Sequence, residues 1–190
     1  MMKPLLPRNL SELQTSVNTG NQPKYLFFWG HTPKLEGSVD QSCLSNWFPA
    51  EFEAENTNYK TAEHYMMAEK ASLFGDRIVR EEILNSRNPA EAKKLGRKVA
   101  GFEQERWEKC RYQIVVDGCY AKFTQNREMK EYLIQTKNRV LVEASPVDLI
   151  WGIGLAADHK DVDNPNKWRG PNLLGFALME VRSRLIRLEG

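Results

Sequence analysis

From Thr61 to Gln135 the chain is an almost unbroken series of helical patterns, separated by short segments of capping or breaking residues. The spacing predicts helices over 61–73, 76–84, 88–99, 103–124 and 127–135. A last helix begins near Asn172 and carries an apolar stripe at intervals of three and four residues. A chain dominated by such patterns folds as a mainly α domain.

The expected strands are few and short, and most lie in the N-terminal half. The aromatic run at 25–30 ends at a glycine and is typical of a strand. Residues 52–60 resemble a small hairpin that turns around 55–58, and 140–143 read as a brief buried strand. We therefore expect helices with a few short β-strands.

The first 23 residues differ in composition from the rest. They are rich in Ser, Asn, Gln, Thr and Pro, with few apolar positions, which predicts a flexible N-terminal extension. The remainder, 24–190, is predicted to form one domain, since 190 residues can bury a substantial core.

Charge and composition exclude several classes of protein. The net charge is +2, from 27 basic and 25 acidic residues, so no overall field marks a general nucleic-acid or membrane binder. No apolar run approaches the length of a membrane span or a signal peptide, and the three cysteines lack zinc-site spacing. We expect a cytoplasmic protein with reduced thiols and no membrane association.

The start of the helix at 61–73 places an acid where its charge is favoured. With Thr61 as N-cap, Glu63 is the second helical residue, and the helix dipole stabilises its carboxylate. Lys70 lies about two turns further along the same face. It can meet a phosphate or a base, or it can be a solvated lysine, and the sequence leaves both open.

A second acid, Asp148, lies between Ser145-Pro146 and Trp151-Gly152. One interpretation is a capping box in which Asp148 bonds back to the backbone of Ser145. The other is a ligand site, because glycine permits close approach of a ligand and tryptophan can stack on a base. The segment after it, 155–170, reads as a polar loop that could lie over a pocket.

Metal and nucleophile chemistry are not supported. His31, His64 and His159 are scattered, and no two share the spacing of a helical metal site. No nucleophile elbow is present and no cysteine has a histidine nearby. We expect no metal.

Eight segments together resemble one known family, the YbiA-like or NADAR family, across about residues 25–187. They are Leu44-Ser45-Asn46-Trp47-Phe48, Glu63-His64-Tyr65 with Ala68-Glu69-Lys70, Leu95-Gly96-Arg97, Trp107, Lys122-Phe123, Leu141-Val142-Glu143, Asp148 with Trp151-Gly152, and Asn172-Leu173-Leu174-Gly175 with Leu178-Met179. The resemblance implies a YbiA-like, mainly helical fold and an N-glycosidase, a hydrolase of N-glycosyl compounds that needs no cofactor. Known members hydrolyse phosphoribosylamino-pyrimidine intermediates of riboflavin biosynthesis, and some relatives remove ADP-ribose from guanine in nucleic acid.

By position, the resemblance places the family's functional acids on Glu63 and Asp148 and its functional tryptophan on Trp107. Cleavage of a ribosyl C–N bond develops positive charge on the sugar, which an ionised carboxylate stabilises. We assign Glu63 to charge stabilisation or water activation and Asp148 to orienting sugar hydroxyls or sharing acid–base work, and the roles can be exchanged. Trp107 can instead be a core residue that shapes the pocket.

Other residues are expected to contact the substrate: Trp29, Gly30, Asn46, Lys70, Arg97, Trp151, Gly152 and Asn172. Arg97 can bind phosphate or, more simply, interact with the C-terminus of its helix. These positions complete the predicted site.

The alternatives to a riboflavin-intermediate hydrolase are an ADP-ribosyl-guanine hydrolase and a non-catalytic module that binds ADP-ribose or a nucleotide. The first would meet nucleic acid only as a modified substrate, and the balanced charge supports it weakly. Two acids argue against the second, because a phosphate-binding pocket gains nothing from negative charge. The extension and the 155–170 loop leave the choice of substrate open.

Overall fold

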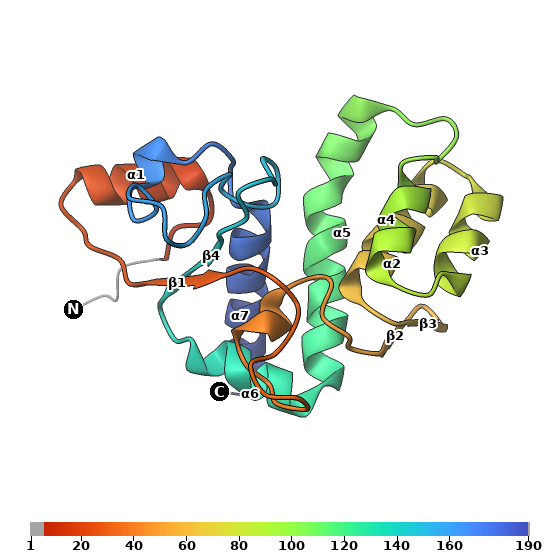
Figure 1. Cartoon of the computed structure of the whole chain (residues 1–190), viewed down its shortest axis with the longest axis horizontal. Coiled ribbons are helices and arrows are strands. Elements are labelled where there is room, and N and C mark those ends of the chain that lie inside the picture. Colours follow the sequence, from red (N-terminus) through yellow and green to blue (C-terminus); the bar gives the residue numbers. More distant parts are fainter. Residues whose placement is uncertain (1–5, 190) are drawn as a thin grey trace. The chain divides into compact units, whose positions relative to one another are not determined.

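The computed structural model describes residues 6–189, and in this part of the chain seven α-helices and four short strands are found (Figure 1). Three of the strands lie in the N-terminal half. The prediction of a mainly α fold with few short strands is confirmed.

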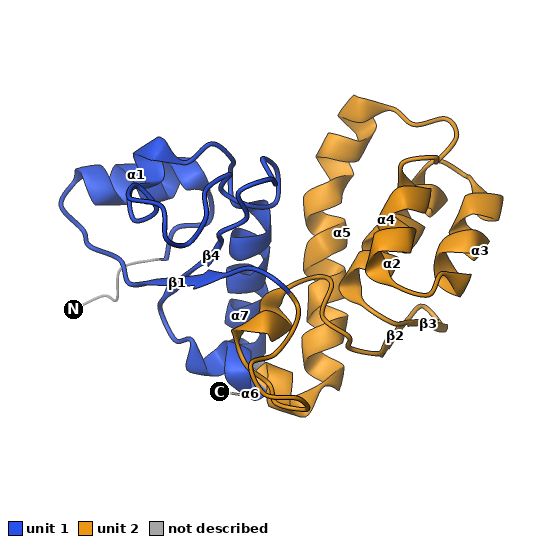
Figure 2. Cartoon of the chain, in the orientation of Figure 1, with its two compact units in different colours: residues 1–30, 131–190 blue, residues 31–130 orange. Residues whose placement is uncertain are grey.

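The chain divides into two compact units (Figure 2). Unit 1 comprises residues 1–30 and 131–190, and unit 2 comprises residues 31–130. The predicted division into an extension, 1–23, and a domain, 24–190, stays a prediction. The extension does contain a helix that the sequence did not reveal, α1 (Leu10–Asn18).

Unit 2 is built around α2 (Ala62–Leu73), which packs against three other helices. These are α3 (Arg77–Asn85), α4 (Pro89–Gly96) and α5 (Gln104–Gln125). The hairpin of β2 (Phe52–Ala54) and β3 (Thr57–Tyr59) and the short 3-10 helix η1 (Gln41–Leu44) precede α2. Helix α2 is buried on most of its circumference and is therefore the central element of unit 2.

Two glycines allow the helices of unit 2 to approach α2 closely. A Cβ on Gly96 of α4 would lie 2.1 Å from Met67 Sδ, and one on Gly118 of α5 would lie 2.4 Å from the Tyr65 ring. Gly118 weakens a helix in isolation. Here it is required by the packing.

Unit 1 contains a parallel pair of strands, β1 (Tyr25–Phe28) and β4 (Val140–Glu143), in register from Tyr25↔Val140 to Phe28↔Glu143. Helix α7 (Leu173–Glu189) packs on β4, and α6 (Arg127–Gln135) leads from unit 2 into unit 1. The short 3-10 helix η2 (Pro165–Lys167) contacts α1, where Gln14 Nε2 donates to the Pro165 carbonyl at 3.1 Å.

The predicted helix bounds agree with the structure to within three residues. The largest difference is in α4, which ends at Gly96 rather than at residue 99, where the chain turns and Lys98 N donates to Leu95 O. Helix α1 was missed because the segment is mostly polar, although Leu10, Leu13 and Val17 lie at helical spacing and Asn9 caps the helix by accepting the Glu12 amide.

Candidate active site

Glu63 lies in the first turn of α2, as predicted. The Thr61 side chain accepts the His64 amide at 3.3 Å and so caps the helix. The Glu63 amide donates to the Asn46 carbonyl at 3.0 Å, which satisfies a donor that has no partner within the helix. The Glu63 side chain is only 3% exposed. Its carboxylate is thus held at a helix N-terminus and away from bulk water.

His64 supports the cap from inside unit 2. Its ring is buried, and Nδ1 lies 2.7 Å from Thr61 Oγ1. Burial lowers the pKa of His64, so the neutral imidazole is favoured beside the helix start. The sequence did not support a metal role for this residue, and it did not reveal the contact with Thr61.

Asn46 belongs to a segment that side chains of α5 hold in place. Its side-chain oxygen accepts the Cys119 thiol at 3.6 Å, while Lys122 Nζ donates to the carbonyls of Cys43 and Ser45 at 2.7 and 2.9 Å. Lys122 is 1% exposed, and burial lowers its pKa to about 8. One feature of the sequence indicated that Lys122 is buried: it lies at helical spacing from Gly118 and Cys119, on the buried face of α5.

Lys70 and Trp107 meet in unit 2. Lys70 Nζ donates to the Gly96 carbonyl at 2.8 Å and lies 4.2 Å from the ring centre of Phe102 and 5.6 Å from that of Trp107. Burial, and then the charge of Arg97, lower the pKa of Lys70. A freely solvated lysine is therefore wrong, because Lys70 ties α2 to the end of α4. Trp107 is buried, as its alternative core role predicts, and Arg97 is exposed at the C-cap of α4.

The remaining predicted residues lie in unit 1, and five of the six follow the two parallel strands at their carboxyl ends. Trp29 and Gly30 come directly after β1, and the loop with Asp148 comes after β4. The Ala144 amide donates to the Phe28 carbonyl at 2.9 Å, which holds the two strand ends together. The Trp29 side chain is 58% exposed and presents an open ring at this edge.

Asp148 lies in a turn and not in the first turn of a helix. Its Oδ1 accepts the amides of Ile150 and Trp151 at 2.8 and 2.7 Å, and its own amide donates to Ser145 Oγ at 3.1 Å. One half of the predicted capping box is present, because Ser145 Oγ accepts the Asp148 amide. The predicted bond from the Asp148 carboxylate back to the Ser145 backbone was wrong, because the carboxylate accepts amides that follow it in the chain. Ser-Pro-x-Asp starts turns as well as helices. The carboxylate is half-buried. The two backbone amides that donate hydrogen bonds to one of its oxygens fix its orientation.

Gly152 and Asn172 connect this loop to β4. A Cβ on Gly152 would lie 2.8 Å from the Glu143 carbonyl, so close packing explains this glycine. Asn172 is fully buried with φ +57°, donates to the Leu141 carbonyl at 2.8 Å and accepts the Glu143 amide at 2.9 Å. Both ends of its amide are engaged, which argues against a substrate contact and for a structural link.

Trp151 has a backbone role at the same place. Its carbonyl accepts the Leu174 amide at 3.1 Å, in the first turn of α7, and its amide donates to Asp148. Its side chain is half-buried.

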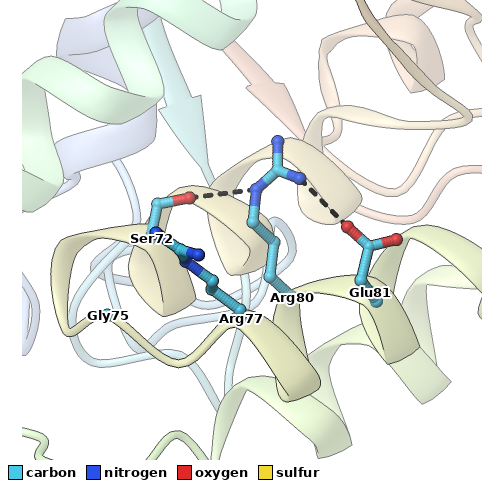
Figure 3. A pocket seen from close by; sticks show the side chains of 5 residues that line it. All are labelled: Ser72, Gly75, Arg77, Arg80 and Glu81. Carbon is cyan, nitrogen blue, oxygen red and sulfur yellow. Dashed lines mark hydrogen bonds and ion pairs between the residues drawn. The ribbon is translucent and has the colours of Figure 1, made fainter.

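A hollow at the end of α2 contains none of the predicted residues (Figure 3). It is lined by Ser72, Gly75, Arg77, Arg80 and Glu81. Arg80 crosses it and is engaged with Ser72 Oγ at 3.0 Å and Glu81 Oε1 at 3.5 Å, as the dashed lines show.

Within residues 6–189, no three His, Cys, Asp or Glu side chains gather in a way that could hold a metal ion. Over the same described part of the chain, no helix is both long enough and apolar enough to cross a membrane.

The family model described as "NADAR domain" matches residues 27–186. N-glycosidase R617 of Acanthamoeba polyphaga mimivirus is 42% identical over 164 residues, which cover 84% of this chain and 95% of that protein. N-glycosidase YbiA of Escherichia coli (strain K12) is 31% identical over 148 residues, covering 78% of this chain and 84% of YbiA.

A solved structure agrees with these matches. The NMR structure of the E. coli protein YbiA superposes with a TM-score of 0.70 at 27% identity, covering 97% of this chain and 95% of that one. The chain therefore belongs to the NADAR family. The expectation drawn from the sequence motifs is confirmed.

Proposed function

We propose that this chain hydrolyses the ribosyl C–N bond of a phosphoribosylamino-pyrimidine, an intermediate of riboflavin biosynthesis, or of a similar N-ribosyl metabolite. The observation that carries the proposal is Glu63, an acid buried to 3% exposure in the first turn of α2.

The enzyme class is broader than this substrate. Relatives from a virus, an enterobacterium and a cyanobacterium are named N-glycosidases, and the match covers most of each chain. The protein is a hydrolase of N-glycosyl compounds. The identity of the base and of the group on the ribose belongs to the proposal.

Glu63 is proposed to stabilise the ribosyl cation. As the C–N bond breaks, positive charge develops at C1′ and the ring oxygen, and a carboxylate beside them lowers the barrier. An electrostatic contact is stronger in a site shielded from water than at an exposed one. The helix N-terminus favours the ionised form that this role requires.

Asp148 is proposed as the second acid, which orients the sugar hydroxyls or shares acid–base work. Two amides already fix one of its oxygens, so the direction of the carboxylate is preset before substrate binds. Water supplies the oxygen that ends on C1′, and the base leaves with a proton. No cofactor enters this reaction.

The exposed Trp29 ring is proposed to stack on the base, since an indole offers a large flat apolar face. Lys70, Arg97 and Asn46 are proposed for phosphate and polar contacts. The Lys70 ammonium, which already donates to the Gly96 carbonyl, would bind the phosphate.

The test is to incubate the purified chain with the phosphoribosylamino-pyrimidine and, separately, with an oligonucleotide carrying ADP-ribosylated guanine. Release of free pyrimidine with ribose 5-phosphate is expected in the first case. Cleavage of only the second substrate would move the proposal to the nucleic-acid alternative. Cleavage of neither, with ADP-ribose binding retained, would leave a binding module.

A matched variant checks the acid. Glu63→Gln is expected to abolish most turnover, while Glu91→Gln, in the first turn of α4 but half-exposed, is expected to keep it. Equal activity of the two variants would contradict the assignment of Glu63.

A further inference from the structure

Lys122 is a buried cation with partners in one short segment. Its side chain is 1% exposed in α5, and Nζ donates to the carbonyls of Cys43 and Ser45, at 2.7 and 2.9 Å. The ring centres of Phe48 and Phe123 lie 5.7 and 5.2 Å from the ammonium. Burying an ammonium is costly unless it is well bonded, so a lysine here requires an explanation beyond filling space.

The segment held by Lys122 continues directly to Glu63. Ser45 is followed by Asn46, whose carbonyl accepts the Glu63 amide at 3.0 Å. The side chain of Asn46 is held from α5 as well, through the Cys119 thiol one turn before Lys122. Two side chains of α5 thus fix the residues that receive the first turn of α2.

These contacts form a short path from α5 to the candidate acid, all inside unit 2. Lys122 binds the carbonyls of 43 and 45, residue 46 binds the amide of residue 63, and Thr61 caps the same turn. A displacement of the 43–46 segment would therefore move the backbone from which the Glu63 carboxylate projects.

We propose that Lys122 is a positioning residue for catalysis, which sets the place of the Glu63 carboxylate by fixing the 43–46 segment against the start of α2. The inference rests on the proposed function, because it gives Lys122 a role in turnover only through Glu63. Misplacement of a reacting group by about 1 Å can cost on the order of 100-fold in rate.

A purely structural lysine would behave like Arg182. That residue is also 1% exposed, in α7 of unit 1, and donates to Thr136 Oγ1 and the Arg139 carbonyl at 2.6 and 3.0 Å. The hydrogen bonds of Arg182 do not lead to the segment that holds Glu63. Arg182→Met is therefore the matched control, since it removes a buried cation of similar burial and bonding.

The experiment compares Lys122→Met and Arg182→Met by thermal unfolding and by steady-state hydrolysis of the phosphoribosylamino-pyrimidine, well below both Tm values. Both variants are expected to lose stability. Lys122→Met is expected to lower kcat about 10- to 100-fold with KM nearly unchanged, whereas Arg182→Met keeps kcat within about twofold.

A double-mutant cycle separates positioning from general weakening. In a Glu63→Asp background, where the carboxylate is already displaced, Lys122→Met is expected to lower kcat less than in the wild type. Equal losses in both backgrounds, or a wild-type kcat for folded Lys122→Met, would overturn the inference. Lys122→Gln, which can still donate to one carbonyl, is judged by the same criteria if the methionine variant does not fold.

Failure of both Lys122 variants to fold would make Lys122 a requirement of folding, and the inference would be overturned. If Glu63→Gln itself keeps full turnover, the proposed role of Glu63 fails before Lys122 is considered. If Glu63→Gln is inactive and folded Lys122→Met is fully active, only the inference about Lys122 fails.

Discussion

The two candidate acids lie in opposite kinds of environment. Glu63, in unit 2, is 3% exposed at the start of a helix whose first turn is tied to Asn46 and Thr61. Asp148, in unit 1, lies half-buried in a loop, where one of its oxygens accepts two backbone amides. Glu63 is suited to stabilising charge, whereas Asp148 also holds together the loop that carries it.

Apart from the loss of Glu63 itself, the largest effect that separates these roles is expected at Asp148. Alanine removes both the charge and the acceptor of two amides, so kcat/KM should fall about 100-fold. Asparagine keeps an acceptor oxygen and should retain the loop, with a loss of about 10-fold. Steady-state kinetics of the two variants measure the difference, and full turnover by Asp148→Asn would leave the residue only its role in the turn.

Asn172 tests how far this loop depends on its link to β4. Asn172→Ala leaves the Glu143 amide and the Leu141 carbonyl without their partner and places alanine at φ +57°, so the free energy of unfolding should fall by about 2–4 kcal/mol. Asn172→Gly loses the same bonds without the backbone strain and should be about 1 kcal/mol more stable than the alanine variant. Urea unfolding distinguishes them. An alanine variant as stable as the wild type would show that the link is not needed.

The cap of α2 gives a smaller effect in unit 2. Thr61→Ala should cost about 1 kcal/mol of stability and also lower kcat, because the cap holds the turn that carries Glu63. Asn88→Ala, at the N-cap of α4, should cost a similar amount and leave kcat unchanged. Parallel measurement of Tm and kcat checks the pair, and equal kcat values would separate the cap from the acid.

The smallest effect is a pH dependence of stability at the same cap. Burial lowers the pKa of His64 in the folded state below its usual 6.5, so the unfolded chain binds the proton more readily. Stability should therefore fall as the pH drops from about 6.5 towards the lower folded-state pKa. Urea unfolding of wild type and of His64→Gln over this range measures it, with His31→Gln, at an exposed ring, as the control. An unchanged slope in His64→Gln would contradict this assignment.

The helices of unit 2 could be predicted because capping residues in the local sequence mark where they begin, such as Thr61, Asp76 and Asn88. The turn at Asp148 was mistaken for a possible helix start because the same residue types begin both structures. Lys122 could not be assigned from the sequence, since its carbonyl partners lie 77 and 79 residues away along the chain. Local sequence patterns predict helices and strands, whereas the contacts that hold a site in place join residues far apart in the chain.

The central claim is that a buried carboxylate at the start of α2 stabilises the ribosyl cation. Single-turnover hydrolysis of the phosphoribosylamino-pyrimidine by wild type and Glu63→Gln, with substrate binding measured separately, tests it most directly. We expect the cleavage step to slow about 1000-fold while Kd changes by less than about threefold. A cleavage rate equal to that of the wild type, or a loss confined to Kd, would contradict the account.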